Sequence, residues 1–247
     1  MSIFSNIFLS LSSLVMPRVC VVCGEPLGEG ERPICDLCRL RVPLTNFADD
    51  DNNPMAARLR NHAPIEHATA LFWYAHNSEW RTAIHNIKYR DAWYSAEKLG
   101  EWLGQELLRS GKFDDIELII PIPLHPVKRL RRGYNQSEHI AIGVGRVLGA
   151  KCDFRSVRRA NNNASQALTQ QSERWENVAS IFKVRDAKRL RGRHLLIVDD
   201  VFTTGATTTS CIEAIVSACD GEVRISVATL AASRRLVEEI SGVEGDM

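Results

Sequence analysis

The sequence lacks the features that identify a membrane-spanning protein or a protein that coats nucleic acid. Its 31 Lys and Arg residues are balanced by 30 Asp and Glu residues, so almost no net charge is left to attract a polyanion over the whole surface, although a local basic face is still allowed. No apolar run is long enough to cross a bilayer. No lysine or arginine precedes Arg18, so the positive start of a signal peptide is missing and we expect none.

What is present suits a folded chain of ordinary composition. The chain has 247 residues, of which 45% are hydrophobic and 25% charged. This length allows one α/β domain and a small accessory module.

The first residues are apolar at helical spacing. Serines separate the apolar positions, which are Ile3, Phe4, Ile7, Phe8, Leu11, Leu14 and Val15. The pattern predicts an amphipathic helix that ends at Pro17. Such a helix packs on its own domain, makes a dimer contact or lies on a membrane surface. The polar face has no basic residues, which disfavours the membrane.

Two pairs of cysteines predict a metal site near the N-terminus. They are Cys20 and Cys23, followed after eleven residues by Cys35 and Cys38. Each C-x-x-C pair places two thiolates on one tight turn, and the glycine-rich connection lets the pairs face each other as a tetrahedral site. We expect structural Zn²⁺, because four thiolates leave no open position for a substrate. Disulfides and an iron–sulfur cluster are the alternatives.

The stretch His194–Thr208, HLLIVDDVFTTGATT, contains the strongest signal for a ligand site. The apolar run Leu195–Val198 predicts a strand buried on both faces of a parallel sheet, and we expect a helix over Cys211–Ala218. Asp199 and Asp200 stand at the expected end of the strand. A strand, a polar turn and a helix form the usual ligand-binding corner of an open α/β sheet.

The turn itself is suited to an anion. It consists of Thr203, Thr204, Gly205, Ala206 and Thr207. The threonines offer hydroxyl donors, the glycine permits close backbone approach, and the start of the helix adds about half a positive charge. The lysine of the ATP-binding P-loop is absent. With two acids that can accept hydrogen bonds from vicinal hydroxyls, the turn indicates a phosphorylated sugar. The alternative is a solvated acidic pair before a Thr-capped helix.

VDDVFTTGATT resembles the motif of type I phosphoribosyltransferases that binds 5-phosphoribosyl-1-pyrophosphate (PRPP). The resemblance implies that Asp199 and Asp200 contact the ribose hydroxyls and that Thr203 to Thr207 hold the 5-phosphate. Neighbouring residues of a strand face opposite sides, so we expect the chain to have left the strand by Asp199.

A basic segment follows the next predicted strand, Glu117–Pro121. Its prolines, Pro121, Pro123 and Pro126, favour a stiff irregular loop. That loop carries Lys128, Arg129, Arg131 and Arg132. This cluster suits a pyrophosphate beside the ribose site, while a solvated loop and a nucleic-acid contact are the alternatives.

The remaining pattern completes an α/β domain. We expect strands at 68–74, 153–157 and 222–230, and helices at 79–90, 94–108 and 135–147. The polar stretch from Arg158 to Gln171 resembles an active-site lid or a surface excursion. Lys88 is expected either near the cleft or, as is more common for such a lysine, in solvent.

The motifs together resemble the ComF/GntX family, from Cys20 to about Leu230. The resemblance is carried by the cysteine pairs, by PIPL and RRGYNQ, by NNASQALTQQSERWENV and by VDDVFTTGAT. The family comprises phosphoribosyltransferase-like proteins linked to bacterial competence and the use of DNA. It implies cytoplasmic location and PRPP or a related phosphoribosyl ligand, with no defined acceptor.

These observations predict a type I phosphoribosyltransferase-like parallel sheet flanked by helices, with an N-terminal zinc ribbon. We expect the helix and zinc module at 1–46, a linker at 47–63, the main domain at 64–232 and a tail at 233–247. The leading hypothesis is a protein that binds Mg²⁺·PRPP and transfers phosphoribosyl to a base or amine, with DNA uptake as its context. The alternative is a non-catalytic competence factor that binds single-stranded DNA, or a protein of the competence machinery, and keeps the phosphoribosyl site as a sensor. The oligomeric state is left open.

Overall fold

A computed structural model of the chain describes residues 18–31, 33–75, 78–88, 92–159 and 181–236. The predicted N-terminal helix and most of the predicted lid and tail lie outside these residues. Five strands form one sheet in the order β1 (Ala68–Tyr74), β7 (Arg224–Ser233), β6 (His194–Phe202), β2 (Leu118–Pro121) and β3 (Lys151–Cys152). All neighbouring strands are parallel, so the expected α/β parallel sheet is confirmed.

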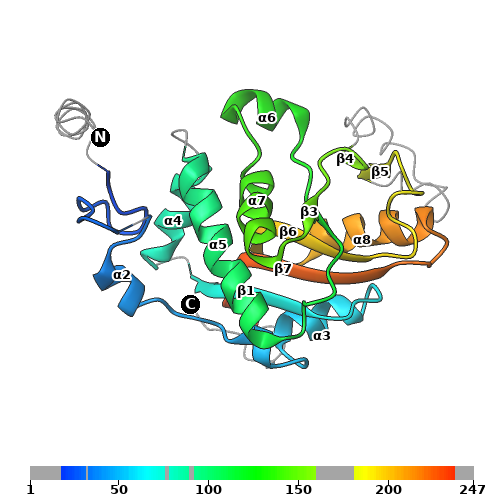
Figure 1. The fold of residues 1–247 in the computed structure, drawn as a ribbon, viewed down its shortest axis with the longest axis horizontal. Helices are drawn as coiled ribbons and strands as arrows, with labels where there is room; N and C mark the ends of the chain where they lie inside the picture. The colour runs from blue at the N-terminus through cyan, green and yellow to red at the C-terminus, as the bar shows by residue number, and fades with distance from the viewer. Residues whose placement is uncertain (1–17, 32, 76–77, 89–91, 160–180, 237–247) are drawn as a thin grey trace, which may run out of the picture.

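Helices cover both faces of the sheet (Figure 1). One face packs against α4 (Trp80–Asn86), α5 (Trp93–Ser110) and α7 (Gln136–Leu148). The other packs against α3 (Pro54–Arg60) and α8 (Ala206–Ala218). Side chains of the run 195–198 alternate between these two layers and are fully buried, which is why the run is apolar at every position. Among the described helices none is both long and apolar enough to cross a membrane.

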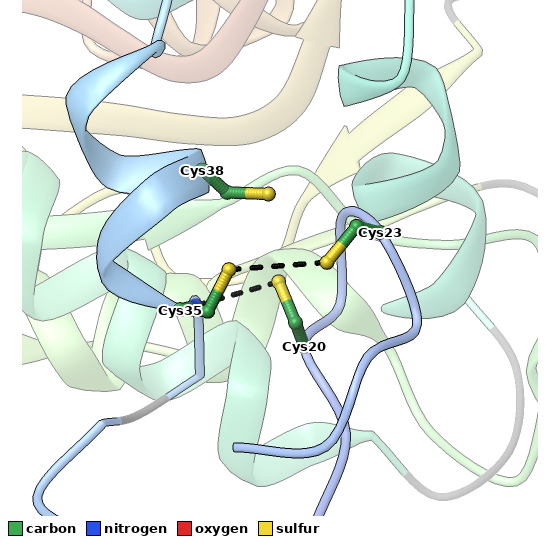
Figure 2. A group of neighbouring side chains, drawn as sticks. All are labelled: Cys20, Cys23, Cys35 and Cys38. Atoms are coloured by element: carbon green, nitrogen blue, oxygen red, sulfur yellow. Dashed lines mark hydrogen bonds between the residues drawn. The ribbon is translucent and has the colours of Figure 1, made fainter. Parts of the chain in front are cut away.

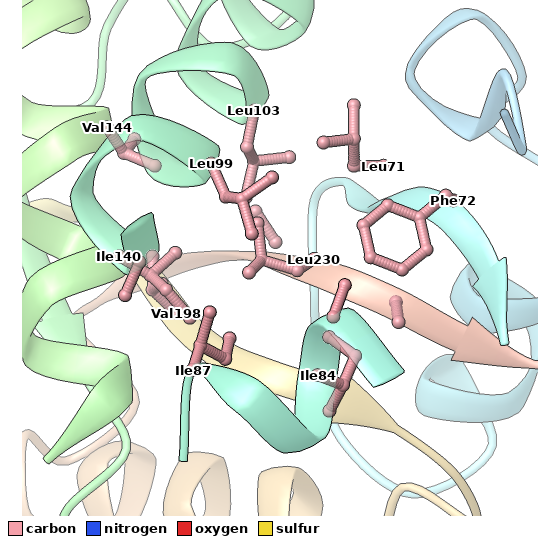
Figure 3. Close-up of a cluster of buried hydrophobic side chains, with 14 of the residues drawn as sticks. Leu71, Phe72, Ile84, Ile87, Leu99, Leu103, Ile140, Val144, Val198 and Leu230 are labelled. Atoms are coloured by element: carbon pink, nitrogen blue, oxygen red, sulfur yellow. The ribbon is translucent and has the colours of Figure 1, made fainter. Parts of the chain in front are cut away.

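The helix α7 is held close to α5 by small residues. A Cβ atom on Gly143 would lie 2.1 Å from the carbonyl oxygen of Glu97 on α5, so only glycine allows this approach. Around the contact, Leu99, Leu103 and Ile140 pack together (Figure 3). The close contact fixes α7, and therefore the residues at its N-terminus, relative to the sheet.

The structure corrects two expectations about secondary structure. The basic segment is not irregular, because residues Pro126–Arg132 form the helix α6. Pro126 is compatible with the first turn of a helix, and the His125 side chain accepts a hydrogen bond from the Val127 N–H at 3.3 Å. The predicted strand at 153–157 is also wrong, since the Asp153 carboxylate instead accepts hydrogen bonds from the N–H groups of Arg155 and Ser156 and forms a turn.

The segment 47–63, which we expected to be a linker, contains packed structure. It forms a short 3₁₀ helix η1 (Phe47–Asp49) and then α3, whose Met55 and Leu59 are fully buried under the sheet. Asn53 caps α3 by accepting from the Ala56 N–H at 2.9 Å. The division of the chain into modules stays a prediction. A separate antiparallel pair, β4 (Val157–Arg159) and β5 (Phe182–Val184), lies beside the sheet.

Candidate functional site

The site lies where the chain order of the sheet reverses. From β2 the chain proceeds to β3 on one side, and from β6 it proceeds to β7 on the other side. The connections that leave the carboxyl ends of these two neighbouring strands therefore diverge and leave a crevice between them. Crevices of this kind are the usual ligand sites of open α/β sheets.

A cleft of about 420 Å³ opens at this point. Several of the residues expected at a ligand site line it, namely Lys128, Arg132, Asp199, Asp200, Thr203 and Thr207. Arg131 is exposed and is not among the lining residues. Arg129 instead makes an ion pair with Glu138 at 2.6 Å. The cleft thus brings together the two acids, two of the four cations expected to face it and part of the threonine-rich turn.

We had expected the strand to end before the two acids, and this expectation is wrong. Both acids nevertheless reach the cleft. The strand β6 continues to Phe202, and Asp199 is in register with Thr229 of β7. On the other side, the pairing of β2 with β6 ends at Val198. Beyond Val198 the β2 side of β6 is therefore open, which gives both carboxylates access to the same cleft.

The environments of the two carboxylates differ. Asp199 accepts hydrogen bonds from the Ser137 hydroxyl and from the Asp200 N–H, both at 2.8 Å. Burial, followed by the charge of Asp200, raises the pKa of Asp199 to about 7, against the opposing effect of these hydrogen bonds. Asp200 is paired with Lys88, whose Nζ lies 2.8 Å from Oδ2. Asp199 can therefore carry a proton near neutral pH.

The turn after β6 forms a small concave site at the start of α8. Residues 201–208, together with Asp199, line a pocket of about 50 Å³. Gly205 precedes α8 with φ +82, and a Cβ atom there would lie 2.7 Å from the ring of Phe202. The glycine is therefore required both for backbone conformation and for space. Anions bind at helix N-termini of this kind, where N–H groups lack partners within the helix.

Some residues of the cleft were given no site role by the sequence. Gln136 and Ser137 were expected only as the start of a helix, yet their side chains contact Asp200 and Asp199. The preceding Asn135 holds them in place, because its side chain accepts from the Ser137 N–H at 3.2 Å and donates to the Ile122 carbonyl at 3.1 Å. Tyr74 and Arg159 also line the cleft. Only the sheet topology brings these distant segments together.

The four cysteines near the N-terminus converge on one point (Figure 2). Their sulfur atoms all lie within 4.8 Å of one another, and the sulfurs of Cys23 and Cys35 are 3.8 Å apart. A tetrahedral zinc site with Zn–S bonds of about 2.3 Å places sulfurs about 3.8 Å apart. Burial and the neighbouring sulfurs raise the pKa of Cys38, so a bound cation is needed to hold this residue as a thiolate. The donor set fits Zn²⁺.

The cysteine cluster is attached to the helical layer of the main sheet. Its buried residues Cys20, Val21 and Cys38 belong to the same apolar cluster as Trp80 and Ile84 of α4. The Asn86 side chain donates to the Val21 carbonyl at 2.9 Å. The short helix α2 (Asp36–Leu40) starts directly after Cys35. The cysteine cluster therefore lies on the same face of the sheet as α4 and α5.

The sequence of the chain is similar to those of known proteins. Residues 130–245 match the model of the phosphoribosyl transferase domain. The DNA utilization protein YhgH of Escherichia coli O6:H1 is 28% identical over 205 aligned positions, in an alignment that covers 78% of this chain and 88% of that protein. Competence protein F of Haemophilus influenzae is 33% identical over 92 residues, which are 37% of this chain and 40% of that protein.

A solved structure is also similar. The PRPP amidotransferase of B. subtilis, complexed with ADP and GMP, has a TM-score of 0.43 and 17% identity over 60% of this chain and 30% of that chain.

The parallel sheet with flanking helices and the matching domain show that the fold is phosphoribosyltransferase-like. Within this class, the expected resemblance to the ComF type is confirmed by the likeness to the DNA utilization and competence proteins.

Proposed function

We propose that the cleft binds PRPP together with Mg²⁺. The observation that carries the proposal is that the acid pair, Lys128 and Arg132 line one cleft together with part of the anion-binding turn. Asp199 and Asp200 accept hydrogen bonds from the ribose hydroxyls, and the turn from Thr203 to Thr207 holds the 5-phosphate. Lys128 and Arg132, which are four residues apart on α6, face the pyrophosphate.

Magnesium fits this ligand and this donor set. Mg²⁺ is commonly bound through substrate phosphates while it keeps several waters, so the ion would enter the cleft with the pyrophosphate. When bound, it neutralises the charge that develops on the leaving pyrophosphate. Arg132 assists by lying beside the same group, and the acids hold the sugar while positive charge develops at its C1 atom.

We propose transfer of the phosphoribosyl group to a nucleophile such as a base or an amine. A screen for pyrophosphate release tests this directly, with Mg²⁺·PRPP and a panel of bases, amines and nucleic acids as acceptors. We expect release that depends on one class of acceptor. Binding of PRPP without release for any acceptor would contradict transfer and favour a sensor function.

The second candidate is a competence factor that binds single-stranded DNA or a protein of the competence machinery. The helix α6 supports it, because Arg131 and Lys128 are exposed there beside Leu130, whose exposed fraction is 88%. Affinity for DNA should fall steeply as salt is raised, since each neutralised phosphate releases counterions. An affinity for DNA that did not fall at high salt would contradict a contact between α6 and the phosphate backbone of the DNA.

We also propose a structural role for Zn²⁺ at the four cysteines and a cytoplasmic location for the protein. The four sulfur ligands close the coordination shell, so the ion stabilises the N-terminal module without taking part in chemistry. Purified protein should contain about one zinc per chain by elemental analysis. Iron in place of zinc would contradict this assignment.

A further inference from the structure

Lys88 enters the cleft from an element outside the phosphate-binding motif. It lies two residues after the end of α4, and its N–H donates to the His85 carbonyl at 3.1 Å. The residue before it is fixed from two sides. The Ile87 side chain is fully buried in the apolar core (Figure 3), and its carbonyl accepts from the Tyr134 hydroxyl at 2.5 Å. The starting point of the lysine side chain is therefore well defined.

Two donors converge on one oxygen of Asp200. Lys88 Nζ lies 2.8 Å from Oδ2, and Gln136 Nε2 donates to the same oxygen at 3.1 Å. The other end of the Gln136 amide accepts from Arg132 Nη1 at 3.1 Å, which sets the orientation of the amide. Within the described part of the chain no donor contacts Oδ1 of Asp200. The contacts thus hold one carboxylate oxygen and leave the other for a ligand.

The charge of Lys88 is required at this position. The Asp200 side chain is only 9% exposed and stands next to a second acid, so an unpaired carboxylate would be strongly unfavourable. Tyr74, Lys128, Arg132 and Arg159 also line the cleft. Arg132 reaches Asp200 through Gln136, whereas Lys88 makes a direct ion pair with it.

We propose that Lys88 is a positioning residue for sugar recognition, which fixes Oδ2 of Asp200 and so presents Oδ1 to a hydroxyl of the ribose. This inference rests on the proposed function of the cleft as a phosphoribosyl site. It assigns Lys88 to the sugar end of the ligand, in contrast to Lys128 and Arg132 at the pyrophosphate. The removal of the Lys88 side-chain charge should therefore lower the affinity for every ligand that carries the ribose hydroxyls, with or without a pyrophosphate group.

Calorimetry with two ligands tests the inference. Ribose 5-phosphate has the sugar and the 5-phosphate but lacks the pyrophosphate of Mg²⁺·PRPP. We expect Lys88→Met to lower the affinity for both ligands by the same factor of about ten, which corresponds to about 1.4 kcal/mol of binding free energy. Lys98→Met is the matched control, because Lys98 is a similarly half-buried lysine paired with Glu101 outside the cleft. It should leave both affinities unchanged.

A double-mutant cycle separates positioning from an independent contact. In the Asp200→Asn background, where affinity still comes from Asp199, the phosphate turn and the cations, Lys88→Met should cause no further loss. An equal loss in both backgrounds, or a larger loss for PRPP than for ribose 5-phosphate, would overturn the inference. Circular dichroism of each variant establishes that it is folded. If the wild-type protein bound neither ligand, the proposed function would fail and this inference with it.

Discussion

The substitution Gly205→Ala tests how the phosphate-binding turn is built. Gly205 has φ +82, and a left-handed conformation costs an alanine roughly 1–2 kcal/mol. Its new Cβ atom would also lie 2.7 Å from Cζ of Phe202, whose side chain is 1% exposed and cannot move into solvent. Overpacking of this kind costs about 1–3 kcal/mol. We therefore expect a total loss of about 2–5 kcal/mol in the free energy of unfolding.

Gly149→Ala is the matched control for the backbone conformation. Gly149 ends α7 with φ +69, and no heavy atom lies within 4 Å of the position of a Cβ atom there. This variant should lose only about 1–2 kcal/mol. Urea unfolding of both variants measures the difference, which reports the clash with Phe202.

Ligand affinity gives a second measurement of the same effect. Relief of the clash must displace the turn between Phe202 and α8, so Gly205→Ala should weaken binding of ribose 5-phosphate at least tenfold, or about 1.4 kcal/mol. Gly149→Ala should leave that affinity unchanged. Equal losses of stability in the two variants would refute the account of a turn packed against Phe202.

Two further predictions concern the metal and the acid pair. Changing Cys35 and Cys38 together to serine should abolish zinc binding and lower the melting temperature, as measured by elemental analysis and thermal melts; a variant that kept one zinc per chain would contradict the ligand set. Asp199→Asn should raise the free energy of unfolding at pH 8 by about 1–4 kcal/mol. Folding raises the pKa of this acid from 3.8 to about 7, so its ionisation destabilises the folded state as the pH rises from 3.8 to 7. The amide does not ionise and avoids this loss. At pH 4, where the wild-type acid is mostly protonated in the fold, the gain should be small, and an equal gain at both values would count against the assignment.

The parts of the site that are contiguous in sequence could be predicted. The turn from Thr203 to Thr207 and the two cysteine pairs each contain all the groups that their chemistry needs within a few residues. Buried strands such as β6 and β1 were also predictable, because their residues are apolar on both faces. Such signals do not depend on the rest of the fold.

The contacts between distant segments could not be predicted. Gln136 and Lys88 meet Asp200 only because α7 and the end of α4 lie on the same face of the sheet. The sequence named no partner for Gln136 at the start of its helix, and it was compatible with Lys88 either near the cleft or in solvent. Their roles depend on the order of the strands, which apolar patterning does not determine.

The basic segment shows how a missed helix changes a site. When read as a loop, it allowed every one of its cations to face the same ligand. In the helix α6, neighbouring residues point about 100° apart, so Arg131 and Arg132 cannot face the same cleft. Lys128 and Arg132 are four residues apart and share one side of the helix, and both line the cleft.

The most direct test of the account is calorimetry of Mg²⁺·PRPP with the wild-type protein and with the double variant Asp199→Asn, Asp200→Asn. The amides keep the shape of the carboxylates and lose the charge-assisted hydrogen bonds to the ribose. We predict binding by the wild-type protein and none by the folded double variant. An unchanged affinity in the double variant would contradict the assignment of this cleft to the phosphoribosyl ligand.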